Sequence, residues 1–361
     1  VVITYGDCPC VPVEALTALI AARAETGSLC ALITAELADP TGYGRILRDA
    51  SGRVRAIREH KDCTPDERAI RHVNPGLYAA DRAFLVEALA AIRSANAQGE
   101  FYLTDLVQIA AERGGVAEVK WEAEVLRGVN DRAELAELET MMWKTIGDRH
   151  RRAGVTVSPT ALIERDVEIG VDAVIGPSVC LRGATRIGAG TSVDVGSVIE
   201  ASTIGPGTAV KPYSVIVRSQ LGANTQIGPF AHVRPDSVVE DDAHVGNFVE
   251  LKKTHLGKGA KANHLAYLGD GEIGPRANIG AGTIFCNYDG YRKHTTTIGE
   301  GAFVGSNSSL VAPVTVGPGA YVGSGSVITV NVPGGALAVG RAKQVNKEGY
   351  VEKIRALKAK K

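Results

Sequence analysis

The chain has 361 residues, enough for two domains, and its 40 Lys and Arg residues balance its 40 Asp and Glu residues. Zero formal net charge argues against a bulk attraction to nucleic acid, and 45% apolar residues are typical of a globular protein. No apolar run approaches the roughly 20 residues of a membrane helix, and no signal peptide is visible. Six scattered cysteines are typical of reduced thiols, so we expect a cytoplasmic protein without membrane insertion.

The first 130 residues alternate apolar strand patterns with helical patterns, which is typical of an α/β domain. We predict strands at 1–5, 29–35 and 54–57, helices at 13–24 and 82–92, and a further helix that begins within 102–105. Val1–Tyr5 resembles a buried interior strand, and nothing leads into it. We therefore expect the sequence given to begin inside a larger domain.

One helix is predicted over 131–152, because Leu135, Leu138, Met142 and Ile146 recur at helical spacing. This helix would join the α/β domain to the part of the chain that follows. A short segment after it, up to Ser158, would lead into a different kind of structure.

From about Val167 to Ile328 an aliphatic residue recurs every six residues, as in Ile169, Ile175 and Leu181. This period fits neither a helix nor a plain alternating strand. It predicts a parallel β-solenoid in which each short strand turns one anchor side chain inward. With three sides to a coil, about eighteen residues make one coil, and this stretch holds roughly nine coils. The period alone does not determine the handedness of the coil.

We accordingly predict four parts of the chain. They are a partial α/β domain at 1–130, a linker helix at 131–153, a β-solenoid at 154–342 and a tail at 343–361. The tail is basic and partly helical. It either caps the solenoid in solvent or binds phosphate, and the sequence leaves both interpretations open.

Two cations of the solenoid share one outward column. Arg234 and Lys252 each directly follow an inward anchor, on neighbouring coils whose strands would lie about 4.8 Å apart. Cations opposed in this way repel each other unless an anion lies against both. We expect either a phosphate between them or two side chains that splay into solvent, with Glu250 or Glu240 as a partner.

Polar side chains are unusually dense on the next coil, at 263–267. His264 lies two positions past an anchor, beside the cation column. A histidine accepts a proton near neutral pH, and an amine nucleophile needs such a base because its ammonium form has no lone pair. His264 is therefore a candidate general base, although a lone histidine more often has a structural role.

The six-residue pattern pauses between Phe285 and Ile298, where a polar loop projects from the solenoid. Ordering such a loop is costly unless it docks, usually on a neighbouring subunit. Lys293 in this loop would add a third positive charge.

Small corners follow at 305–307 and 323–325. They would leave a shallow groove along one edge, suited to a thin ligand such as a pantetheine arm. Arg341, Lys343 and Lys347 are placed to hold phosphates at the end of this groove.

Three motifs, at 263–270, 278–283 and 286–290, together resemble those of a specific bacterial enzyme family. That family makes UDP-N-acetylglucosamine and fuses a glucosamine-1-phosphate N-acetyltransferase to an N-acetylglucosamine-1-phosphate uridylyltransferase. The resemblance spans essentially the whole chain. It implies a Rossmann-like nucleotidyltransferase domain, a left-handed parallel β-helix of hexapeptide repeats, and a cytoplasmic homotrimer with acetyl-transfer sites between subunits. Its substrates would be sugar phosphates, with acetyl-CoA and UTP as co-substrates, and nucleic acid would not be a partner.

The resemblance assigns roles in the β-helix by position. His264 is similar to the general base that assists direct attack of the sugar amine on the thioester, and Glu250 is a plausible charge partner near it. The sugar-phosphate binders correspond to Arg234, Lys252, Tyr267, Asn278 and Lys293. The acetyl-CoA binders correspond to Ala281, Asn287, Tyr288, Ser306, Ser324 and Arg341. Backbone N–H groups near Ala281 would stabilise the oxyanion.

The N-terminal part resembles the uridylyltransferase core. Asp7 and Asn130 correspond to the Mg²⁺ ligands, and oxygen ligands from few residues suit that ion. The sugar-nucleotide contacts correspond to Tyr5, Gly6, Gly44, Glu59, Asn74 and Asn130. The family's glycine-rich nucleotide loop with its basic residue is not found before Val1, and Pro75 replaces the usual hydroxyl residue. We therefore expect uridylyl transfer to be impaired in the chain as given.

Other functions fit parts of the pattern. One is a hexapeptide-repeat acyltransferase that acts on another nucleotide-linked amino sugar. A second is a solenoid zinc hydratase, for which four histidines are available: His232, His244, His255 and His264. A third is a non-catalytic trimeric scaffold that carries a decayed sugar-nucleotide domain.

Overall fold

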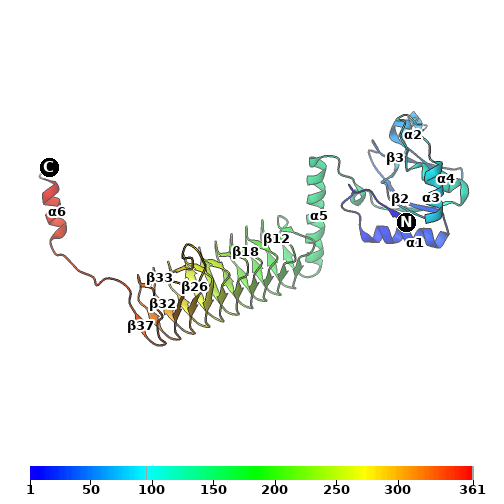
Figure 1. The fold of residues 1–361 in the computed structure, drawn as a ribbon. Coiled ribbons are helices and arrows are strands. Elements are labelled where there is room, and N and C mark those ends of the chain that lie inside the picture. Colours follow the sequence, from blue (N-terminus) through cyan, green and yellow to red (C-terminus); the bar gives the residue numbers. More distant parts are fainter. Residues whose placement is uncertain (95, 360–361) are drawn as a thin grey trace. The chain divides into compact units, whose positions relative to one another are not determined.

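A computed structural model describes residues 1–94 and 96–359 of the chain, which forms two compact units, Val1–Met142 and Trp143–Lys361 (Figure 1). The two units meet within one long helix, α5 (Arg132–Arg152). Its presence confirms the helix predicted at 131–152. Among the described residues, no helix is both long and apolar enough to cross a membrane.

The first unit contains one seven-stranded mixed sheet in the order β1-β6-β2-β5-β3-β4, with β7 paired to β2. Among the described strands of this sheet, β2 and β7 are parallel and the other pairs are antiparallel. The strands are β1 (Val2–Ile3), β2 (Cys30–Glu36), β3 (Gly44–Arg48), β4 (Val54–Arg58), β5 (His72–Asn74), β6 (Tyr78–Ala80) and β7 (Val116–Lys120). The helices are α1 (Val13–Thr26), α2 (Pro65–Arg68), α3 (Arg82–Ala91) and α4 (Asp105–Arg113), with short 3₁₀ turns η1 (His60–Asp62) and η2 (Glu124–Leu126).

The central strand β2 explains how this unit is layered. Its side chains alternate, so Leu32 packs with α3 and α4 on one face while Ile33 packs with Leu19 of α1 on the other. Both faces of the strand are therefore covered by helices, and its first six residues are buried. A strand buried on both faces reads as a continuous apolar run, which is why the sequence predicted it at 29–35.

The structure corrects the prediction for residues 1–5. Only Val2–Ile3 form a strand, which lies at the edge of the sheet and pairs antiparallel with β6. Val1 is 56% exposed and Tyr5 is 44% exposed, so this segment is not a buried interior strand. The segment is apolar, but it has a sheet neighbour on one side alone.

The second unit is a parallel β-helix with three flat faces, numbered here in the order in which the chain visits them. Face 1 has eleven strands: β8 (Thr156–Val157), β11 (Val174–Ile175), β14 (Ser192–Val193), β17 (Ala209–Val210), β20 (Gln226–Ile227), β23 (His244–Asn247), β26 (Lys261–His264), β29 (Asn278–Ile279), β32 (Phe303–Val304), β35 (Tyr321–Val322) and β37 (Leu337–Ala338). Face 2 has ten strands: β9 (Leu162–Ile163), β12 (Cys180–Arg182), β15 (Val198–Glu200), β18 (Val215–Val217), β21 (His232–Val233), β24 (Glu250–Lys252), β27 (Tyr267–Gly269), β30 (Ile284–Cys286), β33 (Ser309–Val311) and β36 (Val327–Ile328). Face 3 has nine strands: β10 (Glu168–Ile169), β13 (Arg186–Ile187), β16 (Thr203–Ile204), β19 (Gln220–Leu221), β22 (Val238–Val239), β25 (His255–Leu256), β28 (Gly271–Ile273), β31 (Thr296–Ile298) and β34 (Val314–Val316).

The predicted anchors form the core of this β-helix. On face 2, Val233, Leu251 and Leu268 are fully buried and stack in register on successive coils. The β-helix is longer than the predicted nine coils, because Val157 and Ile163 continue the six-residue pattern toward the N-terminus and are also buried. It begins at Thr156 and its last strand ends at Ala338, so the segment up to Ser158 already contains the first strand and does not merely lead into it.

Two features interrupt or follow the repeat. Tyr288 and Lys293 pair as an antiparallel bridge, so the predicted loop folds back on itself as a small hairpin. The basic tail contains helix α6 (Tyr350–Lys358), as predicted.

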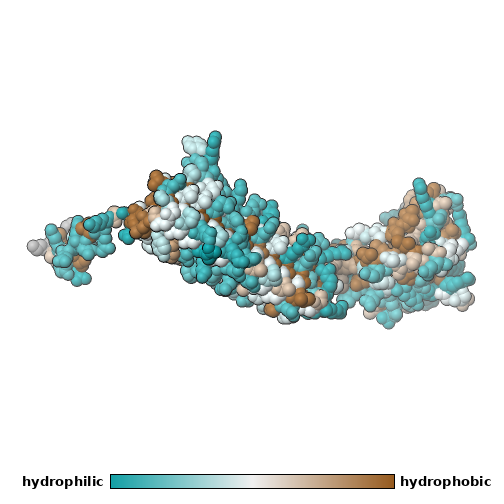
Figure 2. All heavy atoms as spheres, turned by 90° about the horizontal axis from the view of Figure 1, so that it is seen from below, coloured by the Kyte–Doolittle hydropathy of each residue, from teal (hydrophilic) through white to brown (hydrophobic). Residues whose placement is uncertain are grey.

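Much of the surface of the β-helix is hydrophilic in the view of Figure 2, with apolar atoms gathered at the end from which the tail leaves.

Phe285 is the largest anchor of the β-helix and is fully buried. We predict that Phe285→Ala lowers the free energy of unfolding by about 3–5 kcal/mol, through lost burial and an unfilled cavity. Chemical denaturation followed by circular dichroism, at one fixed protein concentration, measures this. Tyr291→Ala is the matched control, because Tyr291 is an aromatic residue of the adjoining hairpin that is 93% exposed. Equal losses for the two variants would contradict the prediction.

Candidate functional sites

Three cations gather on the outer side of face 2. Val233 pairs with Leu251 in the ladder, so Arg234 and Lys252, which directly follow them, lie on neighbouring coils as predicted. The ammonium of Lys252 lies within hydrogen-bonding reach of Lys293 from the hairpin, and the charge of Arg234 acts on both lysines. The structure therefore brings Arg234, Lys252 and Lys293 together.

Carboxylates compensate part of this positive charge. Arg234 Nη1 lies 2.7 Å from Glu250 Oε1, and Lys252 Nζ lies 3.6 Å from Asp270 Oδ2. Pairing of Arg234 with Glu250 is one of the two outcomes that the sequence left open. Glu240, the other carboxylate considered, instead contacts His255. A hollow of about 650 Å³ beside this cluster is lined in part by Lys252, Asp270 and Lys293.

The proximity of the two lysines shifts their pKa values in opposite directions. The hydrogen bond between the amines raises the pKa of Lys252, helped by the Asp270 carboxylate. The same hydrogen bond, together with the charge of Lys252, lowers the pKa of Lys293. The side chains of Lys252 and Asp270 are only 20% and 12% exposed. Lys293 is therefore the cation of this cluster that loses its proton first as the pH rises.

The candidate base lies at the edge where face 1 turns into face 2, named here edge 1/2. His264 ends strand β26, is exposed, and pairs in register with Asn247 on the coil below. Its Nδ1 lies 2.5 Å from Asn247 Oδ1. Because an amide oxygen only accepts hydrogen bonds, this contact places the imidazole proton on Nδ1 and leaves Nε2 with its lone pair. Sequence reasoning proposed Glu250 as the partner of the base and missed Asn247.

Four of the predicted acetyl-CoA residues continue the column of His264 along edge 1/2. The N–H of Gly282 donates to His264 O, that of Asn307 to Ala281 O, and that of Gly325 to Ser306 O, so Ala281, Ser306 and Ser324 occupy equivalent positions on successive coils. Ser306 and Ser324 are exposed. A Cβ added to Gly325 would lie 3.7 Å from Arg341 Cδ, so Arg341 passes over the end of this column. The structure thus aligns His264, Ala281, Ser306, Ser324 and Arg341.

The remaining β-helix residues do not join that column within one chain. Asn287 is buried among the cations, where its amide donates to Asp270 and lies 3.5 Å from the Tyr267 hydroxyl. Asn278 lies on face 1, paired between Lys261 and Phe303. Tyr288 is 60% exposed on the hairpin, where its hydroxyl donates to Gly290 O.

The first unit gathers its predicted residues around one hollow of about 350 Å³. Among its lining residues are Tyr5, Asp7, Gly44, Glu59, Asn74 and Asn130. Gly6 is the remaining predicted contact, and it lies between two lining residues in the sequence. Sequence reasoning missed Glu134, which also lines the hollow and accepts hydrogen bonds from the Asn130 backbone and amide N–H groups.

Several contacts shape this hollow. The Val129 N–H donates to Asp7 O over 2.9 Å, which brings the chain around Asn130 next to Asp7. Glu59 accepts a hydrogen bond from the Thr104 hydroxyl, and it lies against Gly44, where a Cβ would be 3.5 Å from the carboxylate. Burial and the charge of Glu59 raise the pKa of Tyr5.

The predicted Mg²⁺ ligands fit that ion in their chemistry. Among the described residues, Asp7 makes no ion pair, and its carboxylate lies against Gly128, where a Cβ would be 3.2 Å from Oδ2. The Asn130 amide group donates through Nδ2 to Glu134, which directs Nδ2 to the protein and leaves Oδ1 as a ligand atom. Two oxygen donors of this kind suit Mg²⁺ when substrate phosphates complete its shell. Within the same described ranges, no three His, Cys, Asp or Glu side chains form a metal-binding group.

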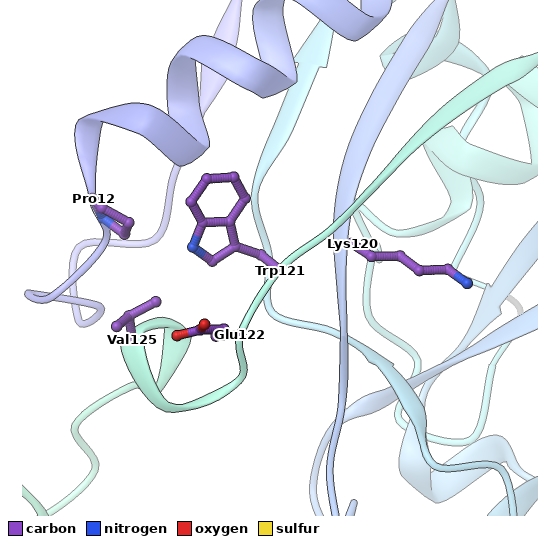
Figure 3. A pocket seen from close by; sticks show the side chains of 5 residues that line it. All are labelled: Pro12, Lys120, Trp121, Glu122 and Val125. Atoms are coloured by element: carbon purple, nitrogen blue, oxygen red, sulfur yellow. The ribbon is translucent and has the colours of Figure 1, made fainter.

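A second hollow of the first unit, of about 620 Å³, contains none of the predicted residues. Figure 3 shows the Trp121 indole on the side of its strand that faces Pro12, just before α1, and Val125 of η2, while Lys120 points to the other side.

Comparison with known proteins defines the class of the chain. A bacterial transferase hexapeptide model matches residues 295–329, and a model of the GMPPB C-terminal domain matches residues 152–258. The second unit is therefore a hexapeptide-repeat, left-handed parallel β-helix. The sequence period predicted the β-helix, and the family resemblance implied its hand. The chain is a transferase in which this β-helix follows a nucleotidyltransferase domain.

Relatives that match nearly the whole of this chain identify the family. The bifunctional protein GlmU of Sorangium cellulosum is 56% identical over 99% of this chain and 76% of its own length. The GlmU proteins of an Anaeromyxobacter species and of Geobacillus thermodenitrificans are 54% and 44% identical, with 73% and 78% of their lengths covered. The chain belongs to the GlmU family. It is a bifunctional enzyme with acetyltransferase and uridylyltransferase activity in UDP-N-acetylglucosamine synthesis, as the motifs indicated, which decides against the hydratase and scaffold alternatives.

The charge state of Lys293 gives a test of the cation cluster. We predict that the affinity for N-acetylglucosamine-1-phosphate falls as the pH rises toward 10.5, the ordinary lysine pKa, because Lys293 with its lowered pKa becomes neutral before that value. Lys293→Arg should abolish this decline, since arginine stays charged throughout the range. Titration calorimetry between pH 7 and the ordinary lysine pKa measures the dissociation constant of this amine-free sugar phosphate.

Lys258→Arg is the control for this titration, because Lys258 is an exposed lysine in the turn after β25 of face 3 and is paired with Asp242. That variant should keep the pH dependence of the unmodified protein. An unmodified protein whose affinity stays constant across the whole range would contradict the assignment of Lys293.

Proposed function

We propose that the β-helix transfers an acetyl group from acetyl-CoA to the amine of glucosamine-1-phosphate at edge 1/2, with His264 as the general base. The observation that carries this proposal is the contact of His264 Nδ1 with Asn247 Oδ1 at 2.5 Å. It orients an exposed imidazole with a free Nε2 at the start of the column that contains Ala281, Ser306 and Ser324.

The reaction proceeds by direct attack of the sugar amine on the thioester carbonyl. The C–N bond forms while His264 Nε2 takes the amine proton, and the carbonyl oxygen becomes an oxyanion. A backbone N–H beside Ala281 donates to that oxyanion. The C–S bond then breaks, and the proton held by His264 goes to the departing CoA thiolate. Asn247 keeps the imidazole in one tautomer throughout.

The sugar phosphate binds the cation cluster. A phosphate dianion replaces part of the compensation that Glu250 and Asp270 give to Arg234 and Lys252, and its charge opposes the lowering of the Lys293 pKa. Tyr267 contributes a hydroxyl near Lys252, while the acyl donor lies along Ser306 and Ser324 toward Arg341.

The chain acts as a homotrimer in which each acetyl-transfer site lies between subunits. Within one chain the cations lie on face 2, Asn278 on face 1, and Tyr288 on a projecting hairpin. One small substrate does not touch all of these from a single face, so a neighbouring copy completes the site. Asn287 and Tyr288 then approach the acyl donor of an adjacent subunit.

The first unit holds the proposed site for uridylyl transfer to N-acetylglucosamine-1-phosphate, in the same cytoplasmic compartment, and the impaired transfer expected from Pro75 stays a prediction. Asp7 and Asn130 hold Mg²⁺, which neutralises phosphate charge when it is bound. The sugar-nucleotide binds the hollow through the remaining predicted residues, Tyr5, Gly6, Gly44, Glu59 and Asn74.

Replacing the base tests acetyl transfer. We predict that His264→Ala lowers kcat for acetyl transfer to glucosamine-1-phosphate about 10²–10⁴-fold, without unfolding the protein, because the side chain is exposed. Asn247→Asp should retain activity but move the acidic limb of the pH–rate profile to higher pH, since a carboxylate raises the pKa of the imidazole. The assay follows CoA release with glucosamine-1-phosphate and, in parallel, with UDP-linked amino sugars.

The matched control is His255→Ala, because that ring is held on face 3 between Glu240 and Glu272 and should be dispensable for catalysis. Survival of activity in His264→Ala would refute the base assignment. Faster acetylation of a UDP-linked amino sugar than of glucosamine-1-phosphate would refute the acceptor.

Metal removal tests the first unit. We predict that Mg²⁺ tightens binding of UDP-N-acetylglucosamine and that Asp7→Asn removes most of this gain, on the order of tenfold, because the charged ligand is lost. Calorimetry with Mg²⁺ and with EDTA measures both constants. Asp66→Asn, at an exposed acid of α2, is the control and should keep the full gain. An Asp7 variant with the full Mg²⁺ effect would rule out this ligand.

A further inference from the structure

The hairpin that interrupts the repeat is closed by one carboxylate. Asp289 Oδ1 accepts hydrogen bonds from the backbone N–H groups of Tyr291 and Arg292, each over 2.7 Å. Its Oδ2 lies 2.6 Å from His294 Nε2 on the opposite arm of the hairpin. Hydrogen bonds from the Arg292 N–H, from His294 and from the Tyr291 N–H lower the pKa of Asp289 to about 2, so the carboxylate stays ionised throughout the neutral range. The pair of Asp289 and His294, called here the clasp, therefore ties the turn and both arms to a single side chain.

Backbone contacts continue the clasp on both arms. The His294 N–H donates to Asn287 O over 2.8 Å, and the Asp289 N–H donates to Arg292 O over 3.2 Å. Gly290 has a φ of 98°, which glycine adopts readily at the first central position of a tight hairpin turn. The side-chain contacts of the clasp and the backbone contacts of the turn thus support the same closed conformation.

Lys293 lies between two residues that the clasp holds. Arg292 precedes it and His294 follows it in the chain, and both contact the Asp289 carboxylate. Lys293 also pairs with Tyr288 across the hairpin. The backbone of Lys293 is therefore fixed on both sides, and its exposed side chain extends from a rigid base.

This placement of Lys293 opposes an electrostatic repulsion. Its ammonium lies within hydrogen-bonding reach of Lys252, and the charge of Arg234 acts on it as well. Like charges at such a distance repel, and a lysine on an unrestrained loop would turn into solvent. Asp270 offsets the repulsion only in part, because it is already paired with Lys252. Holding the third cation in the cluster therefore requires a rigid hairpin.

We infer that Asp289 and His294 are positioning residues for acetyl transfer, which hold Lys293 in the cation cluster where the phosphate of the acceptor binds. The inference rests on the proposed function, and it adds that a hairpin clasp assembles the cluster against the repulsion of its own charges. Asn287 depends less on the clasp, because it is buried and its amide donates to Asp270 of the β-helix. The clasp therefore acts on the acceptor through Lys293 alone.

Opening the clasp should release Lys293 from Lys252, and the pKa of Lys293 reports this directly. We expect Asp289→Ala to return the pKa of Lys293 from its lowered value toward 10.5, the ordinary value for lysine. Competitive labelling of the full chain with acetic anhydride over a pH series, followed by peptide mass spectrometry, measures this pKa because only the neutral amine reacts. A pKa that stays equally low in the variant would overturn the inference, and so would an unmodified protein in which it is not lowered.

Steady-state kinetics give a second measurement. Asp289→Ala should raise KM for glucosamine-1-phosphate roughly tenfold, as expected for one lost hydrogen bond to a charged group, with kcat and KM for acetyl-CoA unchanged. In a Lys293→Ala background the same change should add little, because a residue that acts only through Lys293 has no effect without it. Asp289→Asn should restore most of the affinity, since an amide oxygen still accepts both backbone hydrogen bonds. Full additivity of Asp289→Ala and Lys293→Ala, or a fall in kcat at unchanged KM, would contradict the positioning role.

Asp49→Ala is the matched control, because Asp49 closes the turn between β3 and β4 of the first unit with the same kind of contacts. Its Oδ1 accepts hydrogen bonds from the Ser51 and Arg53 N–H groups, and its Oδ2 lies 3.1 Å from Arg53 Nε. Hydrogen bonds, first that from the Ser51 hydroxyl, lower the pKa of Asp49 to about 2. This variant should change neither the pKa of Lys293 nor KM for glucosamine-1-phosphate.

Labelling needs no catalytic activity, so failure of the clasp and failure of the proposed function are separated. An unmodified protein that does not acetylate glucosamine-1-phosphate, but whose lowered Lys293 pKa depends on Asp289, supports the clasp and refutes the proposed reaction. An active protein in which neither the Lys293 pKa nor KM responds to Asp289→Ala supports the reaction and overturns the clasp. If Asp289→Ala loses its β-sheet spectrum, His294→Ala, which leaves both backbone hydrogen bonds of the turn in place, decides by the same criteria.

Discussion

One inward aliphatic side chain on each short strand holds the β-helix together, and this constraint determines what every other residue of the repeat can do. When Val233, Leu251 and Leu268 stack at the centre, the residues beside them are forced outward or onto a corner at a fixed height. Hydrophobic burial has no preferred direction, but the buried anchors are regularly spaced along the chain. A functional side chain is therefore placed to within one coil by its distance from the nearest anchor, and the placement is as rigid as the core.

That rigidity makes the cation cluster possible. Three positive side chains on adjacent coils repel each other, and the fold provides Glu250 and Asp270 to compensate two of them. The compensation is incomplete, because the pKa of Lys293 is lowered by its neighbour Lys252. In the proposed function, a phosphate dianion exchanges with the carboxylates that already compensate two of the cations, so the same residues would stabilise the unliganded protein and bind the sugar phosphate.

The sequence predicted what depends on the repeat and on motifs, and missed what depends on short-range geometry. The column of Arg234 and Lys252 followed from counting, because a period of six fixes the register. The partner of His264 could not be predicted by counting, because Glu250 and Asn247 both lie one coil away. Only the turn at the corner decides which of them faces the imidazole. The apolar composition of Val1–Tyr5 predicts a buried strand. Exposure, however, depends on the neighbouring strands in the sheet, which composition does not encode. Short strands such as β5 and β6 carry too few residues to show a period.

Edge 1/2 joins these arguments in one place. Many corners of this β-helix hold a residue in the left-handed region, and the large apolar side chains there are exposed, so core packing does not determine their size. Along this edge the chain uses aromatic rings below His264 and glycine or asparagine above it. On the proposed function, the base stands at the change from bulky to small corners, next to the cations of face 2, where the amine of the bound sugar phosphate meets the thioester.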